Sequence, residues 1–212
     1  ETAARSCGRR TSPLFRLCRC RASTGPREKT APTTLSQIKE KISIAAKKSG
    51  RKPQDVKLVA VSKHFPAESI KEAMAAGQFL FGENYIQELQ NKRDLVPAEA
   101  EFHFIGHLQS NKAKFAAQAC SMIETVDNYK LGRTLNNHLE ILNKTLNILI
   151  QVNIGNDDQK TGIAAFDAEE LLVQLNELAR IKVCGLMTMP PLTAKPEESR
   201  PYFRDLRVLA ER

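Results

Sequence analysis

The sequence predicts an α/β fold, and within that class a (β/α)8 TIM barrel. The first observation is a set of short apolar runs rich in β-branched residues, which is the pattern of buried parallel strands. The second is that a helical pattern follows each run, and strict strand–helix alternation predicts a parallel sheet with right-handed crossovers. The third is that no G-x-G-x-x-G motif follows the first run, which argues against an open dinucleotide-binding sheet.

A helix is expected to open the fold. Thr34 or Ser36 can cap its N-terminus, and apolar residues then recur at a spacing of three to four. Lys47 and Lys48 fall in the last expected turn, where cations complement the helix dipole, and Gly50 is the expected stop.

Strand–helix units are expected to follow this helix. The expected strands are 56–63, 79–84, 101–106, 122–127, 146–153 and 181–189. The expected helices after them are 66–76, 85–95, 109–119, 129–143, 167–179 and 196–212. A (β/α)8 barrel needs eight such units, so we expect a C-terminally truncated barrel with six of the eight. Its outer strands would have unpaired edges that favour self-association, whereas a full-length barrel is expected to be a monomer.

Residues 1–33 are expected to be a disordered basic tail, and the folded domain is expected to span 34–212. The tail holds seven arginines and one lysine against two glutamates, with many Ser, Thr and Pro residues. An organellar transit peptide, for a mitochondrion or plastid, or a mis-started sequence would share this composition. Because the tail carries most of the net charge of +8, the folded part is nearly neutral and no nucleic-acid partner is expected.

The rest of the composition predicts a globular chain without a membrane partner. No apolar run approaches the ~18 residues of a membrane-spanning helix. The five cysteines form no recognisable motif, so a reducing, cytoplasmic compartment is the simplest interpretation. His103 and His107 have the sequence spacing of a metal pair. On a strand, however, four residues span about 13 Å, so no metal is expected.

The strongest candidate for chemistry is Lys63, at the C-terminal end of the expected strand 56–63. Barrels of this class place their reactive groups at the C-terminal ends of strands. Partial burial of an ammonium costs free energy, which favours the neutral and nucleophilic amine. On position alone, the alternative is an ordinary surface lysine at a strand end.

Polar or reactive residues end most of the other expected strands. They are Asn84, His107, Asp127, Asn153 and the segment Met187-Thr188-Met189. Asn84 can also be a helix N-cap, with Gln87 completing a capping box, and Asp127 is expected to cap the helix 129–143. Met187 can equally be core filler.

Several sequence blocks carry a more specific signal. They are LVAVSK at 58–63, FGENYIQE at 81–88, HFIGHLQSNK at 103–112, ETVD at 124–127, QVNI at 151–154 with KTG at 160–162, and GLMTM at 185–189. In this order they resemble the YggS/PROSC family of pyridoxal 5′-phosphate (PLP) homeostasis proteins. The resemblance extends from about residue 35 to about residue 210.

The resemblance implies a barrel like the N-terminal domain of alanine racemase, with PLP as cofactor. Lys63 matches the lysine that forms a Schiff base with PLP. Asn84 and His107 match strand-end residues near the cofactor, and Met187 matches a position close to its ring. The family further implies an intracellular PLP homeostasis protein without catalysis of its own, with PLP-dependent apoenzymes as partners.

The sequence departs from the family pattern in two places. His64-Phe65 follows Lys63, where Thr-Lys or a similar pair is more usual. The family segments of Ser-Met-Gly-Met-Ser and Arg-Ile-Gly type, which bind the phosphate and face the pyridine nitrogen, do not occur in this sequence. Weak phosphate binding is therefore expected.

Two other functions compete with that of a PLP carrier. One is a PLP-dependent amino-acid racemase, although two-base racemisation needs an acid–base group on each face of the cofactor. No second domain is expected in this sequence to supply the second group. The other is a plain phosphate-binding barrel in which Lys63 makes only an electrostatic contact.

Overall fold

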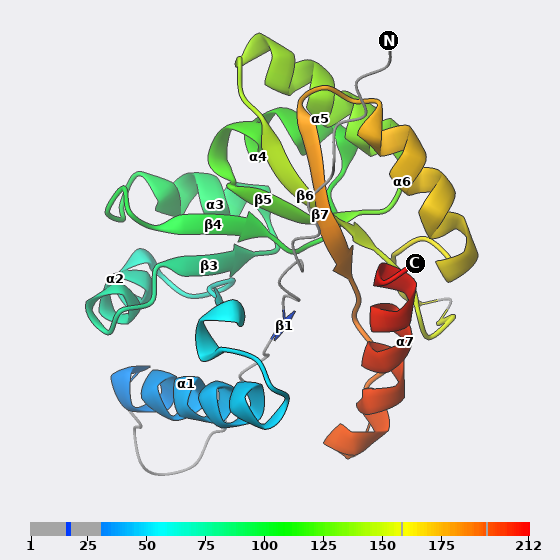
Figure 1. The fold of residues 1–212 in the computed structure, drawn as a ribbon. Coiled ribbons are helices and arrows are strands. Elements are labelled where there is room, and N and C mark those ends of the chain that lie inside the picture. The colour runs from blue at the N-terminus through cyan, green and yellow to red at the C-terminus, as the bar shows by residue number, and fades with distance from the viewer. Residues whose placement is uncertain (1–15, 18–30, 158, 194) are drawn as a thin grey trace, which may run out of the picture.

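The computed structural model of the chain describes residues 16–17, 31–157, 159–193 and 195–212 (Figure 1). Its strands are β1 Arg16–Leu17, β2 Leu58–Val61, β3 Leu80–Glu83, β4 Glu101–Phe104, β5 Met122–Val126, β6 Leu146–Gln151 and β7 Ile181–Met187. Its α-helices are α1 Ala31–Lys48, α2 Ala67–Ala75, α3 Ile86–Arg93, α4 Ala113–Ala119, α5 Tyr129–Ile141, α6 Ala168–Asn176 and α7 Arg200–Ala210. Short 3-10 helices are η1 Pro53–Asp55, η2 Ser110–Lys112, η3 Ala165–Asp167 and η4 Pro196–Ser199.

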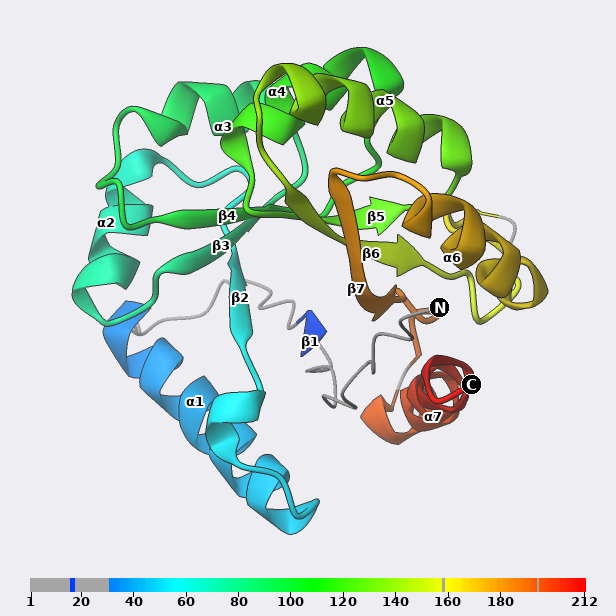
Figure 2. The same ribbon diagram turned by 45° about the horizontal axis from the view of Figure 1, so that its top comes forward.

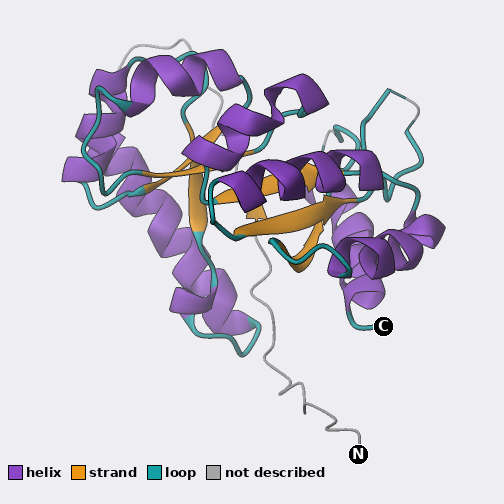
Figure 3. Ribbon diagram, turned by 90° about the horizontal axis from the view of Figure 1, so that it is seen from above, coloured by secondary structure: helices purple, strands orange, loops and turns teal. Residues whose placement is uncertain are grey.

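The strands form one parallel sheet in which they follow one another in chain order, from β1 to β7. The sheet curves into an arc, and helices α2 to α6 cover its outer side (Figure 2). The view from above shows the helices outside the strands (Figure 3). This is the wall of a (β/α) barrel, in which the C-terminal ends of all strands meet at one rim.

The expected α/β class and the six strand–helix units are confirmed. Strands β2 to β7 and helices α2 to α7 occur in the expected order. Several strands end earlier than expected because the chain leaves the sheet before the polar residues at the rim. Thus β2 ends at Val61 and β6 ends at Gln151.

Two parts of the expected tail belong to the fold instead. Residues 16–17 form β1, where Arg16 pairs with Leu58 and Leu17 pairs with Val59. The expectation of an unpaired edge on that side of β2 is therefore wrong at these two positions. Residues 31–33 belong to α1, and the rest of the tail lies outside the described residues.

The start of α1 differs from the expectation, whereas its end agrees with it. The helix begins at Ala31, so Thr34 and Ser36 lie inside it and neither is the N-cap. Pro32 fits this earlier start, because the first turn of a helix tolerates a residue without an N–H group. Gly50 follows the helix with a φ of 72°, a left-handed conformation that glycine adopts without steric cost.

Neither the N-cap considered as an alternative role of Asn84 nor the N-cap expected at Asp127 occurs in the structure. The N-cap of α3 is Tyr85 and not Asn84, and no side chain makes a capping hydrogen bond there. Asn128, and not Asp127, caps α5: its Oδ1 accepts a hydrogen bond from the Leu131 N–H at 2.9 Å.

The main hydrophobic core lies between the sheet and the outer helices. Phe81, Phe102 and Phe104 of the strands and Leu89 and Leu135 of the helices belong to it, and each is at most 1% exposed. Complete burial of one such side chain stabilises the fold by about 1.5–3 kcal/mol. This packing fixes the strands, and therefore the positions of the groups at the rim.

The inner face of the sheet carries a smaller cluster made by Met122, Leu149 and Met187. Ile148 and Ile150 belong to the main core, so Leu149 between them points to the opposite face. The strands therefore present one set of side chains to the helices and another to the inside of the arc.

Candidate functional site

Lys63 lies just beyond the C-terminal end of β2. After the strand, Ser62 to Phe65 form a turn in which the Phe65 N–H donates to the Ser62 carbonyl at 3.1 Å. Lys63 is half-buried, and its ammonium makes no hydrogen bond or ion pair with the described residues. The rim of the sheet thus holds an amine that its described surroundings leave available.

The backbone on both sides of Lys63 is fixed. The Ser62 N–H donates to the Gly82 carbonyl at 3.0 Å, which continues the pairing of β2 with β3. His64 has a φ of 65°, which costs free energy for a residue other than glycine. Its N–H donates to Glu88 Oε2 at 2.8 Å, and its Nδ1 lies 3.2 Å from Glu88 Oε1. The turn is therefore tied to β3 and to α3.

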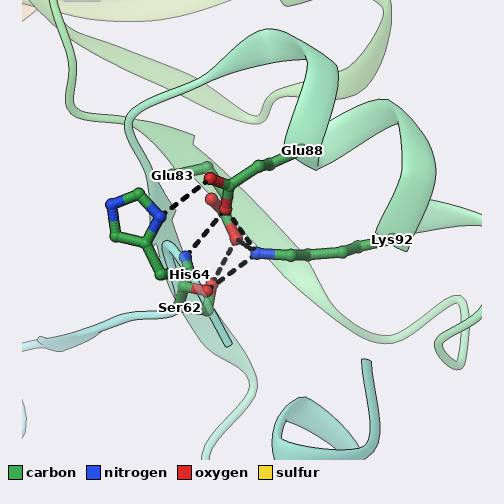
Figure 4. A network of polar contacts seen from close by, with 5 residues as sticks. All are labelled: Ser62, His64, Glu83, Glu88 and Lys92. Atoms are coloured by element: carbon green, nitrogen blue, oxygen red, sulfur yellow. Dashed lines mark hydrogen bonds and ion pairs between the residues drawn. The ribbon is translucent and has the colours of Figure 1, made fainter. Parts of the chain in front are cut away.

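A buried polar network lies behind this turn (Figure 4). Lys92 Nζ donates to the Ser62 carbonyl at 2.8 Å, to Glu83 Oε1 at 2.9 Å and to Glu88 Oε2 at 2.9 Å. Ser62 Oγ also donates to Glu83 Oε1, at 2.8 Å. Lys92 is 8% exposed and Glu83 is 0% exposed. All three hydrogens of the ammonium are used, and two of them go to carboxylates of opposite charge, those of Glu83 and Glu88.

The surroundings of Glu88 lower the pKa of its carboxyl below the ordinary value. Partial burial acts in the opposite direction, because it disfavours the charged form. The N–H of His64 and the ammonium of Lys92 favour the charged form, and together they outweigh the burial. The carboxylate is therefore held in the charged state that the turn and Lys92 require.

Asn84 and His107 line one cavity of about 110 Å³, between the start of α3 and the loop after β4. Asn84 is half-buried and His107 is exposed, with its Nδ1 4.0 Å from Asp127 Oδ2. Gly106 allows the two strand ends to approach, because a Cβ atom there would lie 2.3 Å from the Asn84 carbonyl oxygen. The structure thus brings together Asn84, His107 and Asp127.

Lys63 and Met187 do not line this cavity. Lys63 is next to Asn84 by register, because Val61 pairs with Gly82 and both candidates lie two residues further along. Met187 ends β7, is 5% exposed and packs in the inner cluster. Its packing role agrees with the core-filler alternative, and its contact with a ligand stays a prediction.

A buried pair of a histidine and a glutamate lies on the inner face of the sheet. His103 Nδ1 lies 2.6 Å from Glu124 Oε1, and their side chains are 6% and 1% exposed. His103 is therefore engaged by a carboxylate and does not pair with His107. Within the described ranges, no group of three or more His, Cys, Asp or Glu residues could hold a metal ion.

The network behind the turn was missed from the sequence, although two signals for it exist. Glu83 lies two residues after the core residue Phe81, and a carboxylate on that buried side of a strand needs a partner. Glu88 and Lys92 have the i, i+4 spacing of a helical ion pair. The participation of Ser62 depends on the register of β2 against β3, which the sequence does not reveal.

The chain is similar to several known proteins. The family model described as alanine racemase, N-terminal domain, matches residues 33–211. The pyridoxal phosphate homeostasis protein of Escherichia coli K12 is 41% identical over 160 residues, which are 74% of this chain and 68% of that protein. This chain belongs to the family of pyridoxal phosphate homeostasis proteins. The Schizosaccharomyces pombe member of the family is 38% identical over 185 residues, which are 86% of this chain and 76% of the yeast protein.

Solved structures agree with the family and with the fold. PipY of Synechococcus elongatus PCC7942, with PLP bound, is 35% identical and has a TM-score of 0.70, over 82% of this chain and 81% of PipY. Alanine racemase of Clostridium difficile 630 is 10% identical with a TM-score of 0.61, over 72% of this chain and 42% of the racemase, and it shows the fold alone. The expected likeness to the alanine racemase N-terminal domain is thereby confirmed. None of the described helices has the length and apolar character needed to cross a bilayer.

Proposed function

We propose that this protein binds pyridoxal 5′-phosphate covalently through Lys63 and acts in PLP homeostasis without catalysing a reaction of its own. The observation that carries the proposal is the half-buried Lys63 amine, which has no hydrogen-bond or ion-pair partner among the described residues. This amine lies at the rim where barrels of this class position reactive groups.

The surroundings of Lys63 fit the chemistry of an aldehyde. The cofactor supplies an aldehyde carbon when it is bound, and a neutral primary amine is the group that reacts with it. Two other partly buried lysines are already engaged. Lys92 holds the network described above, and Lys144 Nζ donates to the carbonyls of Ala117 and Cys120 at 2.9 and 3.2 Å. Lys63 is left available by the described residues, and so is the half-buried Lys112 beside the Asn84–His107 cavity. Lys63 differs from Lys112 in lying directly after a strand of the sheet, β2.

The remaining candidates would hold the cofactor beside Lys63. The Asn84 amide and the His107 imidazole offer hydrogen-bonding groups at adjacent strand ends. Met187 offers a polarisable apolar surface on the inner face of the sheet. These roles follow from the positions of the residues together with the family motifs.

The relatives support the carrier role. The E. coli and S. pombe relatives are named pyridoxal phosphate homeostasis proteins, and PipY was solved with PLP bound. We propose that this protein likewise buffers PLP and delivers it to PLP-dependent apoenzymes.

We place the protein in the cytoplasm, with a mitochondrion or plastid as the alternative if residues 1–33 are a transit peptide. Imaging fluorescent fusions with and without those residues distinguishes the two.

Absorbance spectra test the binding part of the proposal. Wild-type protein mixed with PLP is expected to show a visible band, because the covalent product of PLP with a lysine absorbs visible light. Lys63→Ala should lack the band. Lys57→Ala is the matched control and should keep it, because Lys57 is exposed just before β2, at the opposite end of the strand. An unchanged band in Lys63→Ala would contradict the proposal.

The same preparations test the absence of catalysis. The shared fold makes an alanine racemase-like enzyme the second candidate function. Alanine incubated with the PLP-loaded protein should racemise no faster than with free PLP. A turnover above ~1 s⁻¹ that is lost in Lys63→Ala would replace the carrier function by a racemase-like one.

A further inference from the structure

We infer that Glu83 and Lys92 form a positioning device that holds the Lys63 turn in its reactive arrangement, an inference that rests on the proposed function of Lys63. Neither residue is proposed to touch the cofactor. Both act through the backbone of the turn and through Glu88.

The contacts of the device surround Lys63 in the sequence. On one side, the Ser62 carbonyl and hydroxyl bind Lys92 Nζ and Glu83 Oε1, respectively. On the other side, the His64 N–H binds Glu88 Oε2, which also accepts from Lys92 Nζ. The residues before and after Lys63 are therefore held by one connected network (Figure 4). The Lys63 side chain makes none of these hydrogen bonds.

Stability alone does not account for this pair. Removing two charges from water is costly, and well-packed apolar residues often stabilise a fold as well as a buried ion pair does. Glu83 Oε2 is moreover buried without a hydrogen-bond partner, which is a cost that an apolar residue would avoid. Apolar packing cannot supply directional bonds to the Ser62 carbonyl and hydroxyl.

The strain beside Lys63 points to the same role. His64 has a left-handed backbone conformation, and such a conformation persists only when the surrounding contacts enforce it. Its N–H bond to Glu88, and the bond of Glu88 to Lys92, supply that enforcement. Without them the turn can relax, and the direction of Lys63 from the end of β2 changes.

Glu83 also couples Lys63 to the next strand. Glu83 ends β3 and directly precedes Asn84, another proposed cofactor-binding residue. The Ser62–Glu83 bond therefore fixes the end of β2 relative to the end of β3. One carboxylate thus sets the relative positions of Lys63 and Asn84.

The test measures how fast PLP labels Lys63. The full chain is mixed with PLP for timed intervals, borohydride then makes the bond permanent, and peptide mass mapping gives the labelled fraction at Lys63 and at the exposed Lys57. Lys92→Met should slow the labelling of Lys63 by up to about 100-fold, the effect of a misplaced reacting group, and leave Lys57 unchanged. Glu83→Gln removes the charge but keeps an oxygen that can accept from Ser62 and Lys92, so it should slow the labelling of Lys63 less. Lys114→Met and Glu72→Gln are matched controls at exposed positions and should behave as the wild type.

The double variant Glu83→Gln/Lys92→Met separates positioning from stability. Lys92→Met leaves the buried Glu83 carboxylate without its cation, whereas in Glu83→Gln Lys92 keeps the Glu88 carboxylate. The double variant leaves neither buried charge, so its resistance to urea should recover from that of Lys92→Met toward that of the wild type. Its labelling of Lys63 should stay slow, because the Ser62 carbonyl still lacks its donor. Glu88→Ala changes a partly exposed residue, should fold, and should also slow the labelling.

The outcomes distinguish the two proposals. If Lys63 of the wild type is not labelled, the proposed function fails, and this inference fails with it. If Lys63 of the wild type is labelled and the folded variants label it at the wild-type rate, only the positioning role is overturned. Equal slowing at Lys63 and Lys57 would also overturn that role.

Discussion

Among the individual residues, Glu88 links the Lys63 turn to pH. The pKa of its carboxyl is lower in the folded protein than the ordinary value of 4.5. Its charged form therefore stabilises the fold fully above about pH 4.5, and this stabilisation is lost as the pH falls through the folded-state pKa. We predict that the wild-type protein has a larger free energy of unfolding than Glu88→Gln at pH 7, and that this difference shrinks in acid. Urea unfolding at several pH values checks this; a constant difference would contradict it.

The individual site residues were predictable to different degrees. The position of Lys63, Asn84 and His107 at the rim could be predicted because each follows an apolar strand, and the ends of parallel strands share one rim. Their contact with a cofactor stays a prediction. The partners of Glu83 could not be found. Their identity depends on the register that places Ser62 beside Glu83, and on the packing that brings Lys92 of α3 behind both.

At the level of elements, Gly106 allows the chain after β4 to pack closely against the end of β3. In Gly106→Ala the new Cβ would lie 2.3 Å from the Asn84 carbonyl oxygen, a backbone atom that cannot turn away. In Gly132→Ala of α5 the nearest atom is Leu175 Cδ2 at 2.2 Å, the end of a side chain that can change rotamer. We predict that Gly132→Ala lowers the free energy of unfolding by about 1–3 kcal/mol, and that Gly106→Ala lowers it by more.

Urea unfolding of both variants measures this order. Gly106→Ala should also weaken PLP binding because it displaces Asn84, whereas Gly132→Ala, on helix α5 and packed against Leu175 and Leu178, should not. If the two variants were equally stable, or if only Gly132→Ala lost PLP, the assignment of Gly106 would be wrong.

The elements themselves were predictable in kind and order, but not at their ends. The apolar patterns predicted the six strands β2 to β7 and the helices that follow them. The N-cap of α5 could not be chosen from the local sequence, because Asp127 and Asn128 are both good cap residues. The choice depends on the residue at which the chain leaves β5. The start of α1 was misplaced because Thr34 and Ser36 resemble caps, although Pro32 also suits a first turn. Strand β1 was missed because a pair of residues carries no period.

For the whole molecule, the edge of the sheet at β7 is the main consequence of the strand order. Among the described residues β7 has one neighbour, β6, so its other edge offers unpaired N–H and C=O groups. We predict concentration-dependent self-association of this chain, measured by sedimentation velocity over a tenfold range of concentration. Cys184→Lys places a charge on this strand and should reduce the association. A single monomeric species at every concentration would contradict the prediction.

We propose that Lys63 is the residue that carries PLP. The most direct measurement is borohydride reduction of the wild-type protein with saturating PLP, followed by peptide mass mapping. We predict the mass of one pyridoxyl phosphate group on the peptide that contains Lys63. The same mass confined to a peptide with another lysine, or no labelled peptide at all, would contradict the claim.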